Sequence, residues 1–148
     1  MIFDSLNNAA QKKQSELSLK KRQEEQLQKN IAEQEETAFI NHLVDYLTPY
    51  IEQTANDVIT HNGDKRERYV HINDIIFGYP KTPYIREHYK SKYDEPIYCF
   101  LWHVETNVKA IFQEKLPAFQ IDLVSRRENG FLRADHQIRI TMQFKKQP

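Results

Sequence analysis

The chain has 148 residues with 21 basic and 21 acidic side chains, so its formal net charge is zero. A balanced charge excludes a global field that would draw the protein onto nucleic acid or anionic lipid, and such a partner would need a local basic patch. The single cysteine cannot form an intramolecular disulfide, and no apolar stretch reaches the length of a membrane span. We therefore expect one domain plus an arm, in the cytoplasm and without a membrane partner.

Residues 1–36 are expected to form a charged helical arm. Gln, Glu, Lys, Arg and Leu dominate residues 11–36, and neither glycine nor proline interrupts the chain from Ser5 to Thr48. Oppositely charged residues such as Glu16 and Lys20 recur at helical spacing, and each such pair adds a few tenths of a kcal/mol. Asp4 or Ser5 is the predicted N-cap of this helix.

The apolar residues of the arm fit a sparse heptad seam. Its apolar members are Leu6, Ala10, Leu17, Leu27, Ile31 and Ala38, while Lys13, Lys20, Glu24 and Gln34 occupy its other core positions. These polar core positions disfavour a stable autonomous coiled coil. Three interpretations stay open: a solvated single helix, a helix for weak self-association or partner binding, and a disordered charged tail. Leu17, Leu27 and Ile31 are the arm's candidate partner-binding residues.

Residues 37–148 are expected to form a compact α+β domain. From Thr37 onwards, apolar residues recur at three- and four-residue steps, which predicts a core-facing helix. The apolar stripe continues past Pro49, so we expect a kink there rather than a new helix. Gly63 is suited to a left-handed residue at the helix end. A short edge strand is predicted over residues 65–72.

A second helix and a hairpin complete the predicted domain. One apolar stripe runs over residues 97–112, between Pro96 and Pro117, and predicts a central core helix. After Pro117 the apolar residues alternate, which predicts two strands joined by a two-residue turn at Asn129-Gly130. That turn would set Ile121 opposite Ile138, with both apolar faces on the same side.

The fold class expected from these elements is α+β. A long N-terminal charged helix precedes a central core helix, which packs on a C-terminal antiparallel β-hairpin or small sheet.

The sequence contains no motif that indicates catalysis or cofactor binding. A Gly-rich phosphate loop, a Cys-x-x-Cys pair and a His-Glu-x-x-His pair are all missing. Cys99 and His103 have a helical spacing that suits a shared metal, but no further Cys or His stands near them to complete a site. His136 is expected to be a hydrogen-bonded, partly buried residue rather than an acid or base. We therefore expect no enzyme activity, no cofactor and no metal.

The segment 79–93 is the second candidate surface because it interleaves tyrosines with basic residues. These are Tyr79, Lys81, Tyr84, Arg86, Tyr89, Lys90 and Tyr93. Such residues could bind a protein partner, hold single-stranded nucleic acid, or wedge the connection against the core. The sequence favours a non-enzymatic protein-binding module of accessory, assembly or inhibitor type. It would act on another protein or a second copy of itself, through this aromatic and basic surface and the N-terminal helix.

Nucleic-acid binding through the segment 79–93 is the alternative hypothesis. Further basic clusters occur at Lys65, Arg66 and Arg68, and at Arg126, Arg127 and Arg133. This alternative would gain support if those clusters converged in space with the segment 79–93.

Overall fold

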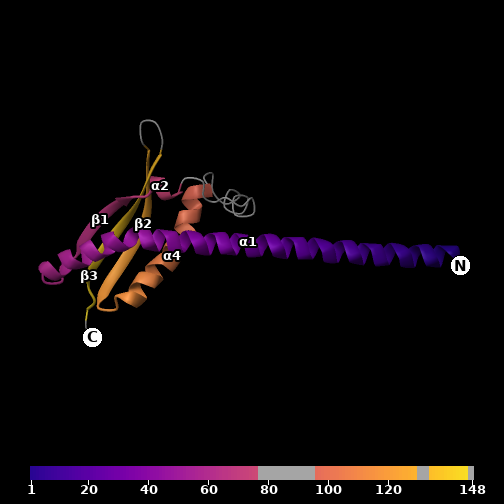
Figure 1. The fold of residues 1–148 in the computed structure, drawn as a ribbon, viewed down its shortest axis with the longest axis horizontal. Helices are drawn as coiled ribbons and strands as arrows, with labels where there is room; N and C mark the ends of the chain where they lie inside the picture. Colours follow the sequence, from indigo (N-terminus) through magenta and orange to yellow (C-terminus); the bar gives the residue numbers. More distant parts are fainter. Residues whose placement is uncertain (77–95, 130–133, 147–148) are drawn as a thin grey trace.

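The computed structural model describes residues 1–76, 96–129 and 134–146. In chain order these ranges contain α1 (Ile2–Thr60), β1 (Arg66–His71), α2 (Asn73–Ile76), α4 (Pro96–Lys115), β2 (Phe119–Asn129) and β3 (Ala134–Phe144). The strands form an antiparallel sheet in the order β1-β3-β2. Helices α1 and α4 pack on each other and against one face of this sheet (Figure 1). The expected α+β class is confirmed.

Helix α1 is continuous over 59 residues. It begins at Ile2, so the predicted N-cap at Asp4 or Ser5 is wrong. Asp4 instead lies in the first turn, where the helix dipole favours a carboxylate. The helix continues through Pro49, in agreement with the apolar stripe on either side of it. The change near residue 36 is therefore one of surroundings and not of secondary structure.

The C-terminal half of α1 supplies much of the core. Its fully buried apolar side chains recur every three or four residues, as helical periodicity requires of one core-facing stripe. With the smaller buried side chain of Ala55, they are Phe39, Leu43, Leu47, Ile51 and Val58. The N-terminal half is exposed throughout, and the first buried side chain along the helix is Ala32. Figure 1 shows this half extending far beyond the sheet as a straight rod.

The end of α1 is fixed by a left-handed turn. Asn62 has φ 60° and Gly63 has φ 87°, and the Gly63 amide donates a 2.8 Å hydrogen bond to the Val58 carbonyl. The Gly63 carbonyl then accepts a 3.1 Å hydrogen bond from the amide of Phe144. A Cβ at position 63 would overlap the Phe144 ring. The prediction for Gly63 is confirmed, and the same residue ties the helix end to β3.

The hairpin has the predicted strands but a different register. Asn129 belongs to β2 and pairs with Ala134, so the predicted two-residue turn at Asn129-Gly130 is wrong. The observed register sets Ile121 opposite Met142 and not opposite Ile138. The predicted and observed pairings differ by an even number of residues, so the same side chains face the core in both.

The observed register is preferred because it pairs more apolar side chains. It places Phe119 opposite Phe144, with ring centres 5.8 Å apart in an edge-to-face arrangement. The predicted register would leave Met142 and Phe144 beyond the start of β2. Pairing both extends each strand to 11 residues. The turn motif was outweighed by this additional pairing.

Side chains of α4 form hydrogen bonds with backbone groups along the outer edge of β2. Glu105 accepts hydrogen bonds from the Ser125 amide at 2.9 Å and from the Ser125 hydroxyl at 2.6 Å. Gln113 accepts from the Ile121 amide at 3.1 Å and donates to the Phe119 carbonyl at 2.6 Å. An unpaired strand edge is a template for aggregation, and these contacts occupy it.

Three polar contacts, made by the side chains of Tyr46 and Arg68, attach α1 to β1, the other outer strand. The Tyr46 hydroxyl donates to the His71 carbonyl at 3.1 Å. Arg68 crosses from β1 to α1, where it donates to Thr54 at 3.2 Å and forms a 3.0 Å ion pair with Asp57. The helix is thus held to the sheet by specific polar contacts as well as by burial of its apolar stripe.

Gly63→Ala is expected to lower the free energy of unfolding by about 1–3 kcal/mol, because a side chain at a strained positive φ is disfavoured. The added methyl group would also displace the Phe144 ring. Asn62→Gly is the matched control, since glycine readily adopts the φ of 60° found there and should leave stability nearly unchanged. Urea-induced unfolding monitored by circular dichroism measures both. Equal stability of the two variants would contradict this account of the turn.

Glu105→Ala is expected to lower the free energy of unfolding by about 1–3 kcal/mol, because it leaves the largely buried amide and hydroxyl of Ser125 without their acceptor. Glu114→Ala, at an exposed position of the same helix, is the control. Urea unfolding of both variants tests the edge contact. If Glu105→Ala were no more destabilising than Glu114→Ala, the contribution of this contact to stability would be refuted.

Candidate partner-binding surface

The heptad positions predicted in the N-terminal helix form one continuous exposed surface, which we call the arm seam. It comprises Leu6, Ala10, Lys13, Leu17, Lys20, Glu24, Leu27, Ile31, Gln34 and Ala38, and every one of these side chains is exposed. Its large apolar members keep about half of their surface in solvent, from 46% for Ile31 to 60% for Leu27. Apolar side chains at this spacing, held on a preformed helix, are what a partner helix or groove recognises.

The arm seam is separate from the face of α1 that packs on the domain. Ile31 is 46% exposed whereas its neighbour Ala32 is 3% exposed. Adjacent helical residues point about 100° apart, so the seam and the buried stripe diverge at this step. Gln34 and Ala38 continue the seam and stay exposed alongside the buried Phe39. The seam is therefore accessible even where α1 lies against the sheet.

Two further apolar side chains show how the arm's surface is divided. Phe3 is 75% exposed and precedes Leu6 by three residues, which extends the seam to the N-terminus. Leu19 is 54% exposed, almost the same as Leu17 at 55%. Two helical positions separate these leucines, so they point about 200° apart and Leu19 lies on the opposite side of the helix. Leu19 is thus a natural internal control for the seam.

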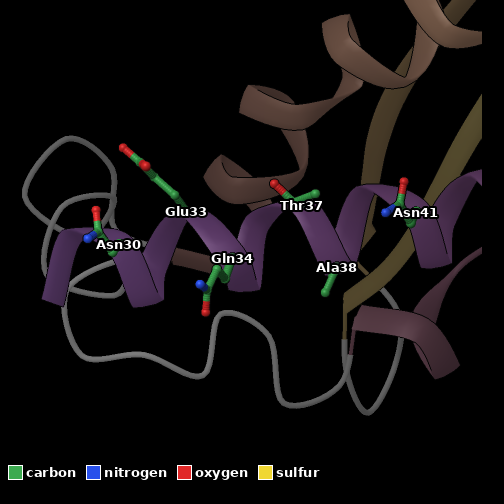
Figure 2. A pocket seen from close by; sticks show the side chains of 6 residues that line it. All are labelled: Asn30, Glu33, Gln34, Thr37, Ala38 and Asn41. Carbon is green, nitrogen blue, oxygen red and sulfur yellow. The ribbon is translucent and has the colours of Figure 1, made fainter. Parts of the chain in front are cut away.

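A hollow of about 510 Å³ lies on α1 where the arm meets the domain (Figure 2). It is lined by Asn30, Glu33, Gln34, Thr37, Ala38 and Asn41. Figure 2 shows Gln34 and Ala38 pointing to one side of the helix and Thr37 and Asn41 to the other. These described lining groups are amides, a hydroxyl, a methyl and one carboxylate, which suit hydrogen bonding to a partner.

The outer face of the sheet presents an aromatic ring and arginines. Tyr69 is 47% exposed, and the guanidinium of Arg126 lies 5.3 Å from the centre of its ring. Arg126 also forms a 3.3 Å ion pair with Glu128. Arg139 pairs with Tyr69 across the strands, and its Nε is buried without a hydrogen-bond partner in the described part of the chain. The cation–π contact holds Tyr69 in place on this face.

Two further ion pairs involve charged side chains of the sheet or of the residue before it. Lys65 pairs with Glu67 at 3.5 Å, and Lys109 pairs with Asp122 at 3.2 Å. Arg68 turns to the other face of the sheet, towards α1, whereas Arg126 lies on the outer face. Arg68 and Arg126, one from each basic cluster, therefore lie on opposite faces of the sheet.

Several predicted site residues fall outside the described residues. The segment with Tyr79, Lys81, Tyr84, Arg86, Tyr89, Lys90 and Tyr93 is one case, and the side chains of Cys99 and His103 are another. Within the described ranges, no group of three or more His, Cys, Asp or Glu side chains could hold a metal ion. Among the same residues, no helix is long and apolar enough to cross a membrane.

His136 and Asp135 lie next to each other in β3 but have different surroundings. His136 is buried, and its backbone amide donates a 2.7 Å hydrogen bond to the Asn73 side chain. Asp135 is partly exposed on the outer face, where Gln137 donates to it at 2.7 Å and His71 Nδ1 lies 3.2 Å away. Hydrogen bonds from Gln137 and then His71 lower the pKa of Asp135 below its ordinary value of 3.8.

Sequence reasoning missed the polar contacts between elements. Glu105 and Gln113 are eight residues apart on α4, so they face the same strand, but their partners depend on the helix lying along the β2 edge. The Tyr69–Arg126 contact likewise requires β1 to pair with β3, a non-local pairing without a sequence signature. The period-two alternation at residues 67, 69 and 71 was the signal that could have placed Tyr69 on an outer face.

Comparison with known proteins gave no relatives: no protein-family model, curated protein or solved structure matches this chain.

Asp135→Asn is expected to lower stability at neutral pH, because the folded state favours the charged carboxylate over the neutral form. A lowered folded-state pKa contributes stability above 3.8, and this contribution is lost as the pH falls from there through the folded-state pKa. The difference in free energy of unfolding between wild type and variant should therefore disappear in acid. Urea midpoints across this pH range measure it, with Asp64→Asn as the control for net charge. A gap that is independent of pH would contradict the assignment.

Proposed function

We propose that this chain is a non-enzymatic protein-binding module whose arm seam is the main binding surface. The observation that carries the proposal is the row of half-exposed apolar side chains on the part of α1 that lies beyond the sheet. Residues 2–31 extend about 45 Å at the helical rise of 1.5 Å per residue. Side chains so placed contribute little to the domain core, so a role in binding explains them better than a role in folding.

The way α1 is built supports binding by the arm. An isolated polar helix is marginal in water because its first turn is costly to form, whereas each later residue adds a hydrogen bond. Here the turns from Phe39 onwards are stabilised by burial, and the arm extends them without a break. The arm is thus ordered before a partner arrives, which reduces the entropy lost on association.

The segment 79–93 is proposed as a second contact of the same module. This part of the proposal rests on the sequence alone, because those residues lie outside the described ranges. The proposed cytoplasmic location rests on the single cysteine, which suits a reducing compartment.

Nucleic-acid binding through the same segment remains the second candidate. It requires an affinity that falls steeply with salt and that weakens on Arg86→Ala or Lys90→Ala. No detectable binding of single or double strands at low salt would remove this candidate.

The proposed function predicts that the double variant Leu17→Gln/Leu27→Gln loses its protein partner. Glutamine preserves helix propensity while removing the apolar contact, so stability should stay within about 0.5 kcal/mol of wild type. Leu19→Gln carries the same chemical change on the opposite side of the helix and is the control. Tagged full-length chains are used to capture proteins from extracts of the native host, and the captured proteins are quantified by mass spectrometry.

Capture by wild type and Leu19→Gln but not by the double variant is the expected result. If all three chains captured the same proteins in equal amounts, the arm seam would not be the binding surface. Unfolding measurements on each variant separate lost binding from lost structure.

A further inference from the structure

The distribution of charge along the arm seam indicates what kind of helix it can accept. Its central part holds Leu17, Lys20, Glu24 and Leu27 in consecutive core positions. Two apolar layers therefore flank two charged layers of opposite sign. A partner must offer leucine opposite leucine and opposite charge opposite Lys20 and Glu24, and this chain carries such a surface itself.

We infer that two copies of the chain associate through their arm seams as antiparallel helices, with Glu24 of one copy opposite Lys20 of the other. This inference rests on the proposed function, because it uses the same surface and names a second copy as the partner. Each heptad has two core positions, its first (a) and its fourth (d). In an antiparallel pair, an a position of one helix faces a d position of the other. The same register then sets Leu17 opposite Leu27, and the two-fold axis repeats both contacts.

The parallel arrangement is disfavoured by the same residues. Parallel helices in register place each core position opposite its own copy. Lys13, Lys20 and Glu24 would then each meet a like charge in the seam. Like charges in such positions oppose association, whereas the antiparallel register turns two of these conflicts into attractive pairs.

The alternative antiparallel register, one heptad away, is also less favourable. It would set Glu24 opposite Lys13 and Leu17 opposite Lys20, so the leucine layers would lose their apolar partners. The inferred register keeps both leucine layers next to the charged pairs. Its least favourable seam layer places Ile31 opposite Lys13, whose long stem can pack while its ammonium stays in solvent.

The positions that flank the seam are mostly neutral in this register. Gln14 faces Gln28 and Glu16 faces Asn30, while Gln23 meets its own copy. Lys21 meets a second Lys21 at the centre, which is a like-charge contact at an exposed flank where salt screens it. Flanking charges therefore neither specify nor block the pairing, and the choice of register lies with the seam itself.

Among the described residues, the seam stays exposed where the second arm would lie. In the inferred register, Leu6 of one copy lies opposite Ala38 of the other. Ala38 is exposed and lines the hollow of about 510 Å³ in Figure 2. The exposed seam thus continues as far as the inferred overlap requires.

Charge reversal in the full-length chain tests the inference, with sedimentation equilibrium as the measurement. Wild type should show a concentration-dependent monomer–dimer equilibrium. Glu24→Lys should weaken dimerisation by about tenfold or more, because the two-fold axis replaces two attractive contacts by two repulsive ones. Lys20→Glu should do the same. The double variant Glu24→Lys/Lys20→Glu should recover dimerisation, since it exchanges the two charges across the antiparallel pair.

Glu25→Lys is the matched control, because it makes the same charge change one residue away from the seam. It should leave the dimerisation constant within about twofold of wild type, as expected for an exposed rim charge. In a parallel pair, Glu24→Lys would replace one like-charge contact by another and change little. That result, or a double variant that fails to recover, would overturn the antiparallel register.

A wild-type chain that stays monomeric at all accessible concentrations would overturn self-association altogether. This outcome is distinguishable from failure of the proposed function. A monomeric chain that still captures another protein only when Leu17 and Leu27 are intact would keep the arm seam as a binding surface while refuting the second copy as its partner.

Discussion

The structure depends on burial of one stripe of α1 against the sheet. Phe39, Leu43 and Leu47 are almost completely removed from solvent, together with the core side chains of β2 and β3. The burial of a large apolar side chain contributes roughly 1.5–3 kcal/mol, so this stripe fixes the helix firmly. The N-terminal half of α1 has no comparable burial and owes its order to continuation of the docked half. One packed interface therefore serves both the core and the arm.

Polar contacts place the elements around that interface. Glu105 and Gln113 hold α4 along the β2 edge, while Tyr46 and Arg68 hold α1 to β1. These contacts lie at both outer strands of the sheet. Strand edges are where foreign chains add most readily, and the contacts of Glu105 and Gln113 occupy part of the β2 edge. The exposed apolar side chains of the arm are the contrasting feature, and this contrast underlies the proposed function.

Sequence patterns predicted the helices and strands well, but they did not predict the register in which the strands pair. The 3.6-residue period identified the core stripe of α1 and most of α4, and the period of two identified the core faces of β2 and β3. The register of the hairpin could not follow from that alternation, because any even shift preserves the faces. The Asn129-Gly130 signal was then the deciding argument, and pairing of Met142 and Phe144 outweighed it. The contact between Phe144 and Gly63 joins segments that no local pattern relates.

The candidate site was predictable in a similarly uneven way. The heptad spacing of Leu17, Leu27 and Ile31 is local, and the structure places all three on the exposed seam. Separation of this seam from the buried face at Ala32 depends on how the helix docks, which the sequence alone does not specify.

The unbroken course of α1 also has a mechanical consequence. The first glycine of the chain is Gly63, so no glycine hinge lies within the rod. A load applied near Met1 acts through a lever of roughly 45 Å about the point where the helix enters the domain. Ala32 and Phe39 are the first buried side chains along the helix, so their packing is the first to resist bending of the arm. A partner bound at the tip would therefore be kept at a set direction from the sheet, without a glycine hinge between them.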